Sequence, residues 1–74
     1  MTDATRLAHE ATLSPRQQEV LELLAEGLSA PLIAERLGIA ETTTRNHIHA
    51  LLHRLGCHSQ LQAVAVARRT HLIG

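Results

Sequence analysis

The sequence predicts an all-α protein: a compact domain of four short helices preceded by a flexible arm. Residues that start or end helices recur along the 74-residue chain. Between them, apolar side chains recur at steps of three and four, which places them on one face of a helix. No segment alternates apolar and polar residues as a strand does. A chain of this length forms one domain, so we expect residues 1–12 to be an arm or linker and residues 13–74 to be the folded part.

The first two predicted helices are marked at both ends. Residues 14–17 contain a serine cap, a proline in the first turn and a glutamine that completes a capping box. The first helix should end near Gly27, because glycine readily adopts the left-handed conformation that closes many helices. Ser29 is expected to cap a second helix, which ends at Gly38 and is followed by a tight turn.

The third predicted helix, from about Glu41 to Leu55, has two contrasting faces. Helical spacing places five residues in one narrow stripe: Thr44, Ile48, Leu51, Leu52 and Leu55. The opposite face carries only hydrogen-bonding and cationic side chains: Thr42, Asn46, His49 and His53, with Arg45 at its edge. A helix that is apolar on one side and polar without acids on the other suits the major groove of double-stranded DNA.

The fourth predicted helix starts with the capping-box pattern of residues 59–62 and runs to about Thr70. It is rich in alanine and has apolar side chains on two faces. One face is needed for the domain's own core, and the other is a candidate seam for a homodimer. The seam candidates are Leu61, Gln62, Ala65 and Val66. The alternative is that the alanines only favour helix formation.

Charge is distributed unevenly along the chain, although the net charge is zero with histidine neutral. Residues 1–41 contain three arginines and seven acidic residues, whereas residues 42–74 contain four arginines, five of the six histidines and no acidic residue. Such asymmetry is typical of proteins that bind nucleic acid. The absence of aromatic residues argues against modules that stack single-stranded bases on aromatic side chains.

Other classes of protein fit the composition poorly. No apolar run approaches the roughly 20 residues of a membrane span, and the first residues do not form a signal peptide. The single cysteine, Cys57, allows no internal disulfide, so a reducing cytoplasm is expected. Cys57 and His58 are adjacent, but no third group is present to orient them as a catalytic pair. We therefore expect no enzyme, no catalytic residue and no cofactor.

Two histidines and the cysteine suggest metal binding as an alternative role. His49, His53 and Cys57 are spaced by four residues, and histidine with cysteine is a zinc ligand set. Gly56 should interrupt that geometry, so we expect polar-face histidines, a core cysteine and no metal site. His47 lies beside the apolar stripe, where a partly buried histidine is expected.

Several motifs occur in the order and spacing of one known family. They include LSPRQQEVLELLAEG, IAERLGI, the Thr43-x-Arg45-x-His47-Ile48 signature and HSQLQAVAVA. From Leu13 to about Ala67 the chain resembles the LuxR/FixJ-type (GerE-like) helix-turn-helix domain of bacterial transcription regulators.

The resemblance implies a function for each part of the domain. It implies a sequence-specific, double-stranded-DNA-binding transcription regulator, or the output domain of a response regulator, with a fourth helix that forms dimers. RNA polymerase is a further candidate partner. In the family, bases are read from the positions of Arg45, Asn46 and His49, and the DNA backbone is contacted from the position of Thr43. With these residues, the predicted DNA-binding set is Thr42, Thr43, Arg45, Asn46, His49, His53 and Arg54.

The sequence also departs from the family's usual pattern. Ala40 stands where a serine or threonine cap is common, and Ala30-Pro31 replaces an Asn-Lys pair. His49, His53 and Gln60 stand where lysine or arginine is common. These changes predict DNA binding that is weaker and more sensitive to salt and pH. Two alternatives remain: an interaction module that no longer binds DNA, and region four of a sigma factor.

Overall fold

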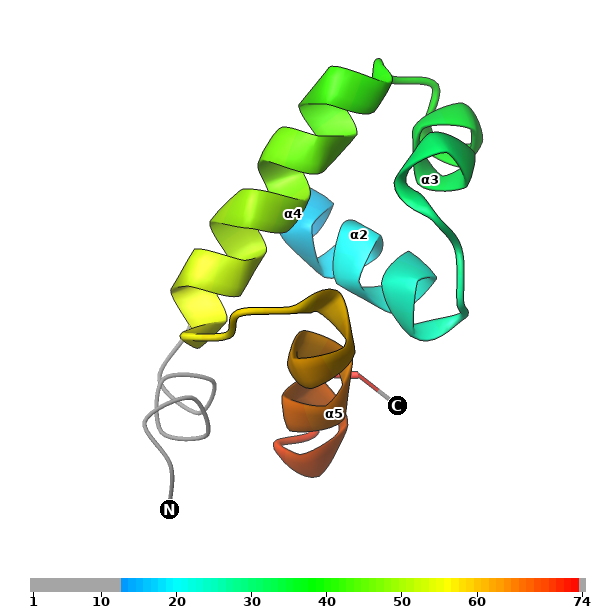
Figure 1. Cartoon of the computed structure of the whole chain (residues 1–74). Helices are drawn as coiled ribbons and strands as arrows, with labels where there is room; N and C mark the ends of the chain where they lie inside the picture. Colours follow the sequence, from blue (N-terminus) through cyan, green and yellow to red (C-terminus); the bar gives the residue numbers. More distant parts are fainter. Residues whose placement is uncertain (1–12, 74) are drawn as a thin grey trace.

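A computed structural model of the chain describes residues 13–73, which form four helices and contain no strand (Figure 1). The helices are α2 (Pro15–Ala25), α3 (Ala30–Leu37), α4 (Glu41–Leu55) and α5 (Gln60–Arg69). The prediction of an all-α, four-helix domain is confirmed. The predicted arm, residues 1–12, lies outside the described residues.

The core forms around α2 and α4, each of which contacts the other three helices. In Figure 1, α4 crosses in front of α2. The first turn of α4 lies beside α3, and its last turn lies near α5. Every helix contributes to the core, whose most deeply buried large side chains are Leu21, Ile33, Leu51, Leu55, Val20 and Val66. The arrangement uses one face of α4 for packing and leaves the other free of the core.

Two of the predicted serine caps form, and one does not. At α2, the Gln17 N–H donates to Ser14 Oγ at 3.1 Å and the Ser14 N–H donates to Gln17 Oε1 at 2.9 Å. Ser29 occupies the cap position of α3, but its side chain makes no capping bond. The predicted position of Ser29 at the start of the helix is therefore right, but the predicted capping by its side chain is wrong. Pro31 at the second helical position has no N–H, so it removes one of the two donors that a cap oxygen normally accepts.

The capping box at the start of α5 differs from the predicted one in one of its two hydrogen bonds. The Gln62 N–H donates to Ser59 Oγ at 3.1 Å, as predicted. The Gln62 side chain, however, accepts from the N–H of His58 at 2.9 Å rather than from that of Ser59. The reciprocal bond of the capping box has moved one residue back, which fixes the loop between α4 and α5.

The start of α4 has no side-chain cap, because Ala40 occupies the cap position. The Thr44 side chain, one turn later, is fully buried. Its hydroxyl donates to the Ala40 carbonyl at 3.2 Å, so the buried polar group has a partner. The Thr44 backbone N–H donates to the same carbonyl at 3.0 Å, so two hydrogen bonds join Thr44 to the residue before α4.

The residues after α5 return to the core. His71 has a left-handed backbone (φ 61°), and the chain reverses so that Ile73 is buried. The Gln18 side chain donates from Nε2 to the carbonyl of Leu72 at 2.7 Å. This contact joins the first helix to the last residues that the structure describes. None of the helices in residues 13–73 is long and apolar enough to span a membrane.

Candidate nucleic-acid interface

The exposed face of α4 carries all of the predicted DNA-binding residues. Thr44, Ile48, Leu51 and Leu55 are buried against the other helices, and Leu52 is partly buried. The predicted set is exposed throughout: Thr42, Thr43, Arg45, Asn46, His49, His53 and Arg54. The structure therefore brings these residues together on one helix, with a polar and cationic surface pointing away from the core.

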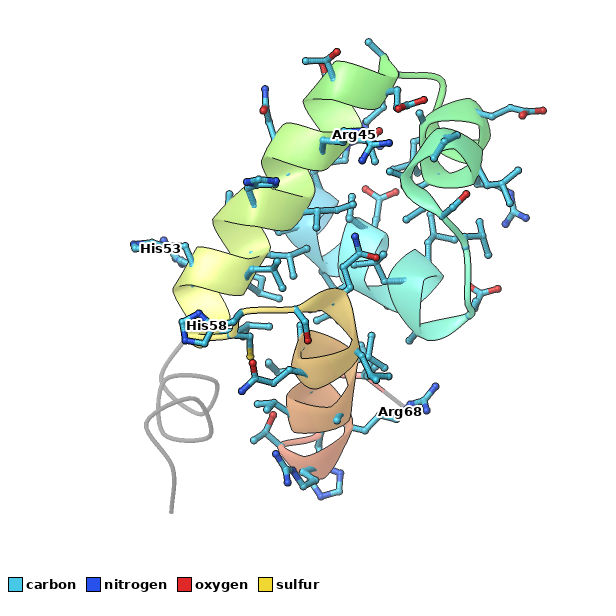
Figure 2. The ribbon with its side chains drawn as sticks, viewed as in Figure 1. Arg45, His53, His58 and Arg68 are labelled. Atoms are coloured by element: carbon cyan, nitrogen blue, oxygen red, sulfur yellow. The ribbon has the colours of Figure 1, made fainter. Side chains whose placement is uncertain are left out.

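The side chains of this surface point in more than one direction. In the view of Figure 2, Arg45 lies on the side of α4 nearer to α3, and His53 projects from the other side, away from the remaining helices. His58 lies in the loop at the C-terminal end of α4. The candidate interface thus spans the width of the exposed helix face.

Arg45 forms an ion pair that the sequence interpretation did not include. Its Nε and Nη2 atoms both donate to Oε2 of Glu41, at 3.0 and 2.8 Å. Both side chains remain about half exposed, at 56% for Arg45 and 48% for Glu41. An acid four residues before an arginine on a helix is the spacing that favours such pairs. That spacing was the available signal for this contact.

The histidines divide into two groups by exposure. His49, His53 and His58 are exposed, whereas His47 is partly buried beside the stripe, as predicted. Within the described residues, no group of three or more His, Cys, Asp or Glu side chains is placed to hold a metal ion.

Cys57 is separated from the two histidines of the alternative zinc set. It is buried in the core, and its Sγ lies 3.6 Å from the Leu55 carbonyl, to which the thiol donates. Burial raises the pKa of the Cys57 thiol, and the positive charge of Arg69 opposes this only in part. A thiolate is needed both for zinc binding and for nucleophilic attack, so this environment favours the reading of Cys57 as a core residue.

The other charged side chains lie mostly away from this surface. Glu19, Glu22 and Glu26 are exposed on or just after α2. Arg68, on α5, donates from Nη2 to the carbonyl of Ala25 at 3.1 Å and so binds the end of α2 (Figure 2). Arg68 therefore supports the fold rather than the α4 surface.

Three of the four predicted dimer residues lie at the surface of α5. Leu61 is 81% exposed, and Gln62 and Ala65 are exposed beside it. Val66 is only 1% exposed, because its side chain packs in the domain's own core. Val66 is therefore corrected from a seam candidate to a core residue. Leu61 also borders a shallow depression whose lining includes Leu28 and Val64.

The chain matches the family described as bacterial regulatory proteins, luxR family, over residues 11–67. It is 41% identical over 61 residues to a probable transcriptional regulatory protein, NarL, of Mycobacterium tuberculosis, which covers 82% of this chain and 28% of the relative. It is 39% identical over 67 residues to the transcriptional regulatory protein LiaR of Bacillus subtilis, covering 90% of this chain and 31% of the relative.

Two solved structures share the fold. The transcription factor GerE superposes with a TM-score of 0.78 at 32% identity, covering 84% of this chain and 92% of GerE. The response regulator ChrA, from a heme-sensing two-component system, superposes with a TM-score of 0.81 at 35% identity, covering 84% of this chain and 31% of ChrA. The chain thus spans less than a third of the length of these curated relatives and most of the length of GerE.

Proposed function

Because this chain belongs to the luxR family of bacterial regulatory proteins, a family of DNA-binding transcription regulators rather than enzymes, we propose that its helical domain reads double-stranded DNA in a sequence-specific way, with α4 in the major groove. One observation carries this proposal: α4 buries one face and exposes the seven polar and cationic side chains of the other. A major groove is about 12 Å wide and admits one α-helix with its side chains directed at base edges.

The resemblance to the family implies a role for several side chains of this surface, and their chemistry is compatible with it. Arg45 donates to guanine or to a flanking phosphate, and Asn46 and His49 contact base edges. Thr43 contacts the DNA backbone. Thr42, His53 and Arg54 extend the surface toward the phosphates on either side.

Selection of bound sites from a pool of random duplexes tests this function directly. The full chain should enrich a common sequence, and raising the salt concentration should weaken binding steeply because phosphate contacts release counterions. Failure to enrich any sequence at low salt would favour the alternative of an interaction module. The cation that is lost where Ala30-Pro31 replaces the family's usual Asn-Lys pair and the exposed Leu61 are the features that fit that alternative.

The names of the relatives support a role in a longer regulator. NarL and LiaR are called transcriptional regulatory proteins, and ChrA is called a response regulator. By this reasoning the domain is the output domain of such a regulator in the cytoplasm, where DNA and RNA polymerase, the further candidate partner, are present.

Dimerisation through α5 is a second part of the proposal. Leu61, Gln62 and Ala65 form an exposed, largely apolar strip next to the core. Ala65→Glu should produce a monomer, because a two-fold axis would place two like charges opposite each other. Sedimentation of the free protein and of its duplex complex measures this. Leu32→Glu, a change at an exposed leucine of α3, is the control and should not alter assembly. A wild-type protein that is monomeric both free and on DNA would contradict the seam.

The histidines of α4 predict a pH effect on DNA binding. His49 and His53 are exposed on the proposed DNA surface, and histidine gains its positive charge between about pH 8 and pH 5. Binding near phosphates favours the charged form, so duplex affinity should rise as the pH falls from about 7.5 to 5.5. The salt slope should steepen by about one for each additional phosphate that is neutralised.

The matched variant for this test is His49→Gln with His53→Gln. Duplex titrations at both pH values, over a salt series, should show a smaller pH effect for the double variant. Circular dichroism at each pH checks that the partly buried His47 has not unfolded the domain. If the wild type and the double variant respond equally while both remain folded, the two histidines do not face the DNA.

A further inference from the structure

The acidic side chain in the first turn of α4 has no role in the core or in the proposed set of DNA contacts. Glu41 is the only acidic residue among the 15 residues of α4, and it is exposed. A carboxylate on a surface that faces DNA should weaken binding through repulsion by the phosphates. Within residues 13–73, its side chain forms hydrogen bonds and an ion pair only with Arg45.

The geometry of this pair leaves half of the Arg45 guanidinium available. The group is planar and has five N–H donors in a fixed fork. The edge formed by Nε and Nη2 donates to Glu41 Oε2. Nη1 and the second N–H of Nη2 donate to no group in the part of the chain that the structure describes. Two parallel donors on this remaining edge match the O6 and N7 acceptors of guanine.

We infer that Glu41 is a positioning residue, which holds Arg45 so that the open edge of its guanidinium donates to guanine rather than to a phosphate. Two effects support this. The ion pair restricts a long side chain that otherwise samples many rotamers, and the negative charge of Glu41 disfavours an approach of the pair to the phosphates. The inference rests on the proposed function, because it requires that α4 lies in the major groove.

The experiment compares the wild type with E41Q, E41D and R45A on duplexes that the wild type selects from a random pool. Each base of the selected site is changed in turn, and the position at which R45A loses its guanine preference is the position that Arg45 reads. There, the wild type should prefer guanine by about 5- to 150-fold. E41Q should reduce this preference by about two- to fivefold, the range expected from the loss of an exposed ion pair.

The salt dependence provides a readout that a merely structural role would not change. Once released, Arg45 can bind a phosphate, so the salt slope of E41Q should steepen by about 0.9. E41D is the matched control, because it retains the charge at the same position but is one methylene shorter than the contact requires. It should lose the guanine preference as E41Q does. Circular dichroism confirms that each variant is folded.

The possible failures are distinguishable. If the wild type enriches no sequence, the proposed function fails and the inference fails with it. If the wild type enriches a site but E41Q keeps the full guanine preference, or R45A removes no base preference, the inference is overturned and the DNA-binding function stands. If E41D behaves as the wild type while E41Q does not, the charge of Glu41 acts without the contact, which also overturns the inference.

Discussion

Leu51→Ala is expected to lower the free energy of unfolding by about 2–5 kcal/mol, the cost of removing a large buried side chain and leaving a cavity. Leu51 is fully buried on α4, and α4 contacts each of the other three helices. A chain of 74 residues has a total stability of roughly 4–11 kcal/mol, so this one change would remove a large share of the domain's stability. Urea unfolding followed by far-ultraviolet circular dichroism measures the loss.

Leu32→Ala is the matched control, because Leu32 is 53% exposed on α3. Its effect should remain within about 0.5 kcal/mol. Equal effects of the two changes would show that α4 does not pack its Leu51 face against the core. Because α4 could not then present its other face to DNA in a fixed orientation, the same result would weaken the proposed function.

Arg45→Ala and Asn46→Ala should each weaken binding to the selected duplex by about 1–3 kcal/mol, which is the energy of one good base contact. Both side chains are exposed on α4, so the free energy of unfolding should change little. Fluorescence titration with a labelled duplex gives the affinity, and circular dichroism follows the helices. Within residues 13–73 the Asn46 side chain forms no hydrogen bond or ion pair, so its variant tests the base contact alone.

Arg69→Ala is the control for both variants. Arg69 is also exposed, but it lies in the last turn of α5 rather than on α4. Its loss should change the affinity far less than the loss of Arg45. Unchanged affinity of the Arg45 and Asn46 variants, with intact helices, would remove these two residues from the interface.

Most of the fold can be predicted from the sequence, because helix periodicity and helix ends are encoded by residues that are close together in the chain. The bounds of α4 follow from periodic apolar residues and from Gly56, whose φ of 67° needs a left-handed conformation. The cap at Ser29 could not be predicted from serine alone, because its partner N–H is absent at Pro31. On α5, apolar residues occupy two faces, and periodicity does not indicate which face the core will use. This ambiguity explains why the sequence predicts Val66 and Ala65 together at the seam. In the structure, Ala65 is exposed and Val66 is buried in the core.

The candidate site could be predicted in its exposure but not in its contacts. Once one face of α4 is buried, helical geometry fixes the exposure of the other. The pairing of Arg45 with Glu41 depends on rotamers, and the bond from Arg68 to Ala25 joins residues 43 positions apart. The first contact lies within α4, where the four-residue spacing favours it without specifying the rotamers. The second arises only when α2 and α5 have packed, so the local sequence pattern does not specify it.

The bond between Gln18 and the carbonyl of Leu72 has a consequence for how the domain is made. It joins residues 54 positions apart, so a growing chain on the ribosome has long completed α2, α3 and α4 before this contact can form. Synthesis proceeds at about 5–20 residues per second. Seconds therefore pass between the synthesis of Gln18 and that of Leu72, to which it binds. During that interval the part of the core that Ile73 covers is still exposed. The emergence of the residues after α5 is therefore the step that completes the core.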